Sequence, residues 1–339
     1  LLFDECHKLV KDADYRNNIT LPIDDFFKFD QKALVSATPI ELNDPRFKEQ
    51  NFKMIEIQPT FDYKKELWLH HTNNTLQALK TVLSKLDNEE TAPLPICVFI
   101  NSTDIIYSLM KQLDLLEDSA VFCAPKSVDK LKKNRFCNVY EEWNKDKMKR
   151  YNFFTSRFFN AVDMELEEQP HVIMLTDVYF AEHTMIDPYT DAIQIVGRFR
   201  NGVSSIIYIS NTKKGLPQRS KEEIKGYLIC SKEIYRTMKN FYDCATDRAS
   251  RDAYRVALES LPFNRMLDRN GRENWFAIDN YMDEELMKNY FHDENSLYKA
   301  YDNCDSFIVY HAGYYCPLGD SERLKRENKS QSIKDKRKE

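Results

Sequence analysis

The sequence predicts an α/β protein built around a parallel sheet. Short apolar runs of strand length recur along the chain, for example at residues 96–100 and 171–175, and each ends in small polar residues. Such near-continuous apolar runs are typical of strands that are covered on both faces. Segments with helical spacing lie between them, as at residues 75–86, where leucine and valine recur every three or four positions.

Composition bounds the class of protein. The 339 residues carry a net charge of -5, with 42% hydrophobic and 30% charged residues, as in ordinary globular chains. This excludes a strongly basic chain, although a local basic groove could still bind nucleic acid. The eight cysteines show no C-x-x-C or paired Cys/His spacing, which argues against zinc and fits a reducing cytoplasm. With no signal peptide and no apolar run of spanning length, we expect a cytoplasmic protein without a membrane partner.

The first strand is expected at residues 1–3 and ends in two carboxylates, Asp4 and Glu5, followed by His7. A second apolar strand at residues 33–35 ends in Ser36 and Thr38. The separation suits neighbouring strands of one sheet joined by a short crossover. The carboxyl ends of such strands are where ligands bind in open α/β sheets. Taken alone, the Asp-Glu pair equally fits an ordinary strand end before a loop.

The middle of the chain continues the strand and helix alternation. Ser102 or Thr103 is expected to cap a helix at residues 104–113. Residues 126–151 are rich in lysine and arginine and include two aromatics, Trp143 and Tyr151. Basic residues beside aromatics could follow a nucleic-acid backbone. A solvated helical face explains most of these charges better.

Two later segments carry polar residues at strand and helix ends. Residues 152–156 form a strand-like run that ends in Thr155 and Ser156, and Asp163 follows. Residues 191–199 begin as a helix and lead to a tight group of polar residues and a glycine: Gln194, Gly197, Arg198 and Arg200. Two guanidinium groups from one short segment can neutralise charge on a transferring phosphate. Pairing of both arginines with surface acids is the alternative.

After Pro217 the pattern becomes mostly helical, at residues 221–258 and in part of 275–301. Asn-Gly within residues 268–272 predicts a hairpin turn. Short strands are expected at 54–57 and 307–310. The aromatic residues after Pro217 could stack bases, but we expect them to form a hydrophobic core. The lysine-rich end, residues 323–339, lacks apolar periodicity and is expected to be frayed.

The motifs together resemble those of superfamily-2 helicases and translocases. Asp4-Glu5-Cys6-His7 followed by Ser36-Ala37-Thr38 is similar to motifs II and III, and the histidine fits the DExH group. Residues 101–103 resemble motif IV, 152–163 motif V and 194–200 motif VI. The resemblance covers roughly residues 1–215. It implies part of a RecA-like domain 1 at 1–60, a complete RecA-like domain 2 at 61–216, and a mostly helical accessory domain with a basic tail at 217–339.

The resemblance also implies roles on the nucleotide side. Asp4 would hold Mg²⁺ through water and Glu5 would activate the attacking water. One arginine, Arg198 or Arg200, would act as the finger on the γ-phosphate. The residues that would sense or contact the nucleotide are His7, Gln194, Gly197 and Asp163. Relatives usually carry glycine shortly before the motif V aspartate, where this chain has Ala161-Val162.

On the nucleic-acid side, the resemblance implies contact or coupling through Ser36, Thr38, Ser102, Thr155 and Ser156. The expected partner is DNA or RNA, single-stranded or at a junction. No G-x-x-x-x-G-K-[ST] loop occurs in the 339 residues. Because the chain opens with Leu1 inside a strand, we expect an upstream half that carries this loop, and an isolated chain with weak or no ATPase activity. The alternative is a non-catalytic binding module that keeps the helicase fold.

Overall fold

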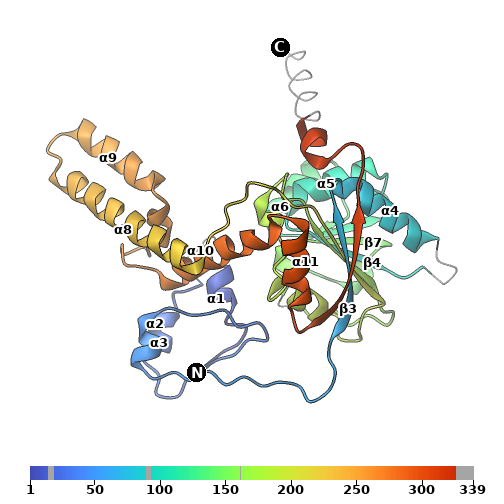
Figure 1. Ribbon diagram of the computed structural model, residues 1–339, viewed down its shortest axis with the longest axis horizontal. Helices are drawn as coiled ribbons and strands as arrows, with labels where there is room; N and C mark the ends of the chain where they lie inside the picture. The colour runs from blue at the N-terminus through green and yellow to red at the C-terminus, as the bar shows by residue number, and fades with distance from the viewer. Residues whose placement is uncertain (14–18, 89–92, 161, 326–339) are drawn as a thin grey trace, which may run out of the picture. The chain divides into compact units, whose positions relative to one another are not determined.

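The computed structural model describes residues 1–13, 19–88, 93–160 and 162–325. It divides into two compact units (Figure 1). Unit 1 combines residues 1–58 with 217–289, and unit 2 combines residues 59–216 with 290–339. Among the described residues, no helix has the length and apolar character needed to cross a membrane.

Unit 2 is built on an eight-stranded sheet in which every pair of neighbours is parallel. The strand order is β10-β3-β9-β8-β4-β7-β5-β6. The bounds are β3 Lys65–Thr72, β4 Ile96–Phe99, β5 Ser119–Phe122, β6 Val139–Tyr140, β7 Tyr151–Phe154, β8 His171–Thr176, β9 Ser205–Ser210 and β10 Phe307–Tyr314. The predicted α/β class with a parallel sheet is therefore confirmed.

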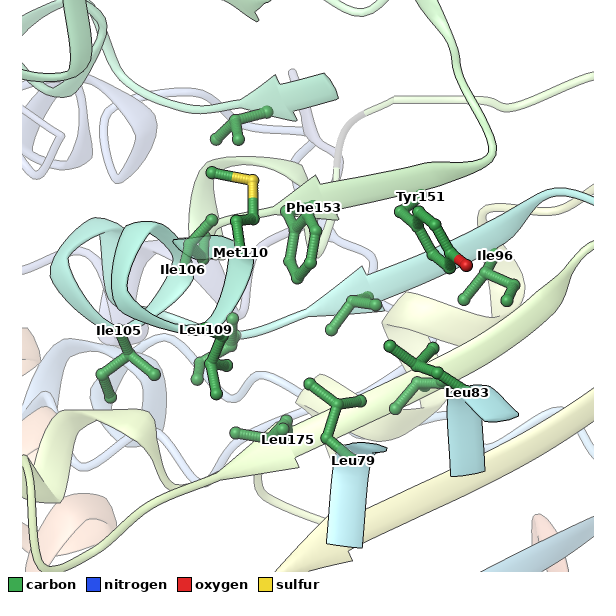
Figure 2. Packing of buried hydrophobic residues seen from close by; sticks show 14 of the residues in the cluster. Leu79, Leu83, Ile96, Ile105, Ile106, Leu109, Met110, Tyr151, Phe153 and Leu175 are labelled. Atoms are coloured by element: carbon green, nitrogen blue, oxygen red, sulfur yellow. The ribbon is translucent and has the colours of Figure 1, made fainter. Parts of the chain in front are cut away.

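Helices follow the strands of unit 2: α4 Thr75–Asp87, α5 Thr103–Gln112, α6 Pro125–Lys133, α7 Asp191–Gly197 and α11 Glu294–Asp302. The apolar stripes of α4 and α5 lie on one layer of the core, as Figure 2 shows. Leu79 and Leu83 of α4 and Leu109 of α5 pack there against Ile96 and Phe153 of the sheet. These side chains are at most 4% exposed. The apolar spacing at residues 75–86 predicted α4 because it follows the buried face of this helix.

The strand order reverses near the middle of the sheet. From β4 the chain moves to β5 on one side, and from β8 it moves to the adjacent β9 on the other side. The carboxyl ends of β4 and β8 therefore flank a switch point, where ligands bind in open α/β sheets.

Unit 1 holds a two-stranded parallel sheet, β1 Leu2–Phe3 and β2 Ala33–Leu34, within a mainly helical body. Its helices are α1 Lys8–Lys11, α2 Ile23–Phe26, α3 Pro45–Glu49, α8 Lys221–Cys244, α9 Arg248–Ser260 and α10 Trp275–Lys288. Val10 and Phe26 share one apolar cluster with Ile224 and Phe276. The early residues and the residues after Pro217 thus form a common core.

Several elements differ from the sequence predictions. Residues 54–57 are not a strand, and Ile55 and Ile57 are 83% and 89% exposed, because no neighbouring strand takes up their backbone groups. The predicted helical stretch 221–258 is two helices, α8 and α9. The turn at 268–272 forms, with Gly271 at φ +73° between the bridge partners Leu267 and Glu273.

The region predicted as one accessory domain, residues 217–339, is shared between the units. Residues 217–289 belong to unit 1, whereas β10 pairs with β3 over all eight residues and belongs to unit 2. The predicted strand at 307–310 is thus longer than expected. Of the predicted basic tail, residues 326–339 lie outside the described residues.

Candidate functional site

The predicted residues of motifs II and III meet at the carboxyl ends of β1 and β2. The ladder between the two strands continues past them, with Val35 donating to the Phe3 carbonyl (2.8 Å) and Cys6 donating to the Val35 carbonyl (3.0 Å). This continuation brings Glu5 and His7 beside Ser36. Short apolar strands that end in polar residues therefore do place these side chains at one edge.

His7 is the centre of this group. The ring is buried, and its Nδ1 lies 2.9 Å from the Ser36 hydroxyl and 3.3 Å from the Glu5 carboxylate. A carboxylate only accepts hydrogen bonds, so the contact fits a proton on Nδ1. The Ser36 hydroxyl also accepts the backbone N–H of buried Thr38 (3.0 Å). The two segments predicted to be motifs II and III are thus joined through a histidine and a serine.

Glu5 adopts an unusual backbone conformation. Its φ is +52°, in the left-handed region that costs a non-glycine residue about 1–2 kcal/mol. Its side chain is 28% exposed, so the carboxylate that contacts His7 is also accessible to solvent. A left-handed residue between the strand and α1 turns the chain sharply and directs this carboxylate.

The Asp4 carboxylate is exposed and accepts the Glu5 backbone N–H (2.8 Å). Within the described ranges, no group of three His, Cys, Asp or Glu side chains is placed to hold a metal ion. Asp4 alone offers one carboxylate. That suits only a Mg²⁺ ion that keeps several waters and takes further ligands from a bound phosphate.

The predicted residues of motifs V and VI meet in unit 2. Met164 and Phe199 form an isolated parallel bridge, and Met164 donates to the Arg198 carbonyl (2.8 Å). This bridge places Asp163 beside both arginines. Its carboxylate lies 2.8 Å from Arg200 Nη2 and 3.8 Å from Arg198 Nη1.

The two arginines occupy different environments. Arg198 is buried, and it donates to the Gln194 carbonyl from Nε (3.0 Å) and to the Gln194 side-chain oxygen from Nη2 (2.8 Å). Arg200 is half-exposed, as is its partner Asp163. Exposed pairs of this kind contribute about 0–1 kcal/mol. Arg200 can therefore exchange its carboxylate for another anion at little cost, whereas Arg198 is held by α7.

Neighbouring atoms leave room for a side chain at Gly197. A Cβ built on it meets no atom within 4 Å among the described residues. No neighbouring atom in the described part of the chain therefore requires glycine at this position.

The residues predicted to face nucleic acid in unit 2 follow adjacent strands. Ser102 follows β4, while Thr155 and Ser156 follow β7, its neighbour. Ser102 already caps α5, since its hydroxyl accepts the Ile105 N–H (3.4 Å). Thr155 is buried and Ser156 is half-buried. Of the departure at Ala161-Val162, Ala161 lies outside the described residues.

The basic stretch 126–151 is largely a solvated surface, as the alternative interpretation holds. Lys130 pairs with Asp104 (2.6 Å), and Lys145 pairs with Glu167 (2.7 Å). Tyr151 lies in β7, is 8% exposed and donates to Asp87 (2.7 Å). It is not available to stack a base.

A buried polar network at the carboxyl ends of β3, β8 and β9 was not singled out from the sequence. Asn211 donates to Asp177 and to Asp320, both at 2.8 Å, and Thr75 donates its N–H to Asp320 (2.9 Å). Burial, and next the Asp320 charge, raise the pKa of Asp177. In the sequence, only the polar strand end at Thr176-Asp177 pointed to this network. No local pattern links Asp177 to Asp320, because the two residues are far apart in the chain.

The two clusters of predicted site residues belong to different units. Asp4, Glu5 and His7 lie in unit 1, and Arg198 and Arg200 lie in unit 2. Within unit 1 Glu5 contacts His7, and within unit 2 both arginines lie near Asp163.

No model of a known protein family matches the sequence, and no curated protein matches it. Among solved structures, S. cerevisiae Dbp5 bound to RNA and ADP BeF3 is similar with a TM-score of 0.39 and 12% identity, over 84% of this chain and 62% of that chain. The C-terminal domain of the DEAD-box protein Dbp5 is similar with a TM-score of 0.26 and 13% identity, over 51% and 86%. The chain thus spans less than two thirds of the first structure. Both TM-scores are below 0.5, so no conclusion about function rests on them.

Proposed function

We propose that the chain is part of an ATP-dependent helicase or translocase of superfamily 2 that moves on DNA or RNA. The observation that supports this most is the convergence of Asp163, Gln194, Arg198 and Arg200 in unit 2. These residues come from two segments that are distant in sequence, and the motif resemblance assigns both segments to one nucleotide site. The DExH subgroup and a cytoplasmic location remain predictions.

In this proposal the unit 1 cluster serves the attacking water. Glu5 accepts its proton, and His7 holds the Glu5 carboxylate in place while connecting it to Ser36. Asp4 would hold Mg²⁺ through water, and the ion would neutralise charge on the phosphates. Thr38, which donates to Ser36, extends the same chain of contacts toward the nucleic-acid side.

The unit 2 cluster serves the phosphate. Arg200 is the finger, because its guanidinium is half-exposed and pairs with the half-exposed carboxylate of Asp163. Arg198 is a positioning residue that ties motif VI to Gln194. An arginine finger contributes roughly 10³ to 10⁵ in rate. Ser102, Thr155 and Ser156 contact the nucleic-acid backbone in this account.

The proposal includes an upstream segment with a phosphate-cradling loop, because no such loop occurs in these 339 residues. Backbone amides and a lysine are needed to hold the phosphates. The test compares ATP hydrolysis, stimulated by single strands, in this chain and in a chain extended upstream. Hydrolysis by the extended form alone is expected. Magnesium-dependent hydrolysis with an ordinary KM in the 339-residue chain would contradict the proposed dependence on that segment.

The same missing loop favours a second candidate, a non-catalytic module that binds nucleic acid. It predicts salt-dependent binding of single strands by both forms, with hydrolysis by neither. The motor predicts that binding and hydrolysis occur together in the extended form. The two candidates therefore differ in one measurement on one pair of proteins.

A further inference from the structure

The two edges of the unit 2 sheet are built differently. One edge strand, β6, has two residues and is followed directly by Glu141 and Glu142. The other, β10, has eight residues, Phe307–Tyr314. Natural sheets protect their edges with very short strands, charged side chains, proline or a covering element, since a bare edge pairs with other strands. The β6 edge uses two of these devices.

The β10 edge uses none of the devices that lie within a strand. Residues 307–314 contain no proline, lysine, arginine, aspartate or glutamate. His311 is their only basic residue, and its ring contacts the Glu294 carboxylate (3.1 Å) on α11. The strand is long, free of aspartate, glutamate, lysine and arginine, and rich in β-branched and aromatic residues, which is the composition that favours strand addition.

The outward backbone groups of β10 can be identified from its register. Residues of a parallel strand turn their backbone groups alternately toward one neighbour and the other. Lys65 donates to the Ser306 carbonyl (3.0 Å), so the even-numbered residues of β10 face β3. The N–H and C=O groups of Val309, His311 and Gly313 face the edge. In the described part of the chain, β10 pairs with no strand except β3.

Side chains beside this edge are also uncovered. The Trp68 and Tyr310 rings stack at 4.7 Å and 23° on one face of the β3–β10 pair. Trp68, Ile308 and Tyr310 are 44%, 42% and 39% exposed. The opposite face is covered by α11, where Tyr298 lies 5.4 Å from the His311 ring. Pairing along the edge would therefore bury apolar surface as well as backbone groups.

We propose that the β10 edge is a dimerisation surface, on which the β10 strand of a second copy of this chain pairs antiparallel about a two-fold axis. A second β10 has the length and the outward backbone groups that the edge requires. Two such strands bring no aspartate, glutamate, lysine or arginine side chains together. A two-fold contact uses both edges and closes, so it yields a dimer and not a fibre.

The test measures the mass of the full chain in solution as its concentration rises, together with hydrogen exchange at residues 307–314. The mass is expected to rise from 40.2 kDa to about twice that value. Val309→Pro removes one outward donor and keeps the β3 ladder. Ile308→Lys brings charge to both strands of the pair. Both variants are expected to stay monomeric. Ile229→Lys, at a 63% exposed isoleucine of α8, is the matched control and dimerises like the unmodified chain.

Exchange at Val309 and His311 is expected to slow as the dimer forms. Circular dichroism checks that each variant is folded. If Val309→Pro does not fold, Ile308→Lys provides the test. A chain that stays monomeric at every concentration overturns the proposal. So does a dimer that persists in Ile308→Lys, a dimer without protection of residues 307–314, or an assembly that grows beyond two copies.

Discussion

At the scale of single residues, Glu5 has a left-handed backbone (φ +52°), as do Asn51, Asp114 and Arg135. Strain of this kind persists only where the surroundings hold it, and it concentrates at functional sites. Glycine would adopt the same φ freely, but it would remove the carboxylate that contacts His7. The Glu5 carboxylate therefore contacts His7 from a strained backbone position.

We predict that Glu5→Gly is more stable than Glu5→Ala by about 1 kcal/mol, because both lose the carboxylate and only glycine relieves the strain. Urea denaturation of the two variants measures the difference. Equal stabilities, or a more stable alanine variant, would show that position 5 is unstrained.

His70 gives a pH dependence with a definite sign. Burial, helped by the charge of Lys85, lowers its pKa from 6.5 to about 4. Below pH 6.5 the unfolded chain therefore binds more protons than the folded chain, so the free energy of unfolding falls as the pH falls toward 4. Between pH about 7 and about 5 this loss is about 2 kcal/mol.

We predict that His70→Phe reduces the pH dependence of stability between those two pH values by about 2 kcal/mol, since phenylalanine cannot take up a proton. Denaturant titrations at both values measure it. His183→Gln, at an exposed histidine, should keep the original dependence. A His70→Phe variant with unchanged pH dependence would contradict the assignment.

At the scale of elements, the segment after β10 is fastened to the carboxyl ends of β3 and β9. Asp320 is buried and accepts from Thr75 N–H, from Asn211 and from Arg323 (3.0 Å). The Asp320 charge also raises the pKa of Asp177, so the network holds repulsion as well as attraction. The three donors converge on one buried carboxylate, and Asn211 and Arg323 also contact Asp177 (2.8 and 3.4 Å).

We predict that Asp320→Ala lowers the free energy of unfolding by about 3 kcal/mol, the cost of breaking a buried charged pair. Asp305→Ala is the control, since the Asp305 side chain is 89% exposed, and it should change stability by less than about 0.5 kcal/mol. Urea titrations measure the free energy of unfolding of both variants. Equal losses would mean that the Asp320 network does not stabilise the fold.

The elements with strong periodicity could be predicted from the sequence, including the strand at 96–100 and the helix at 75–86. Residues 54–57 could not, because their apolar character is typical of a strand and only the absence of a pairing neighbour keeps them irregular. β10 was foreseen as a short strand, but its register with β3 depends on a contact between distant segments that no local pattern records.

At the scale of the whole molecule, the composition change after Pro217 coincides with the point where the chain passes from unit 2 to unit 1. No such change was noted at Tyr290, where the chain returns to unit 2. Contacts among the predicted residues of one segment pair were more predictable than the division into units. His7, Ser36 and Glu5 contact one another as two short strands with polar ends suggested. The separate environments of Arg198 and Arg200 were beyond sequence analysis, because burial of one arginine depends on the packing of α7.

Under the proposed function, Glu5 and Arg200 both serve ATP hydrolysis. The most direct test is ATP hydrolysis, with and without single strands, by the chain extended upstream through a phosphate-cradling loop. We expect Glu5→Gln to abolish hydrolysis and Arg200→Ala to lower its rate by roughly 10³-fold or more. Glu49→Gln, at an exposed glutamate of α3, should leave it unchanged. An extended chain that hydrolyses no ATP, or one whose rate survives Glu5→Gln, would contradict the account.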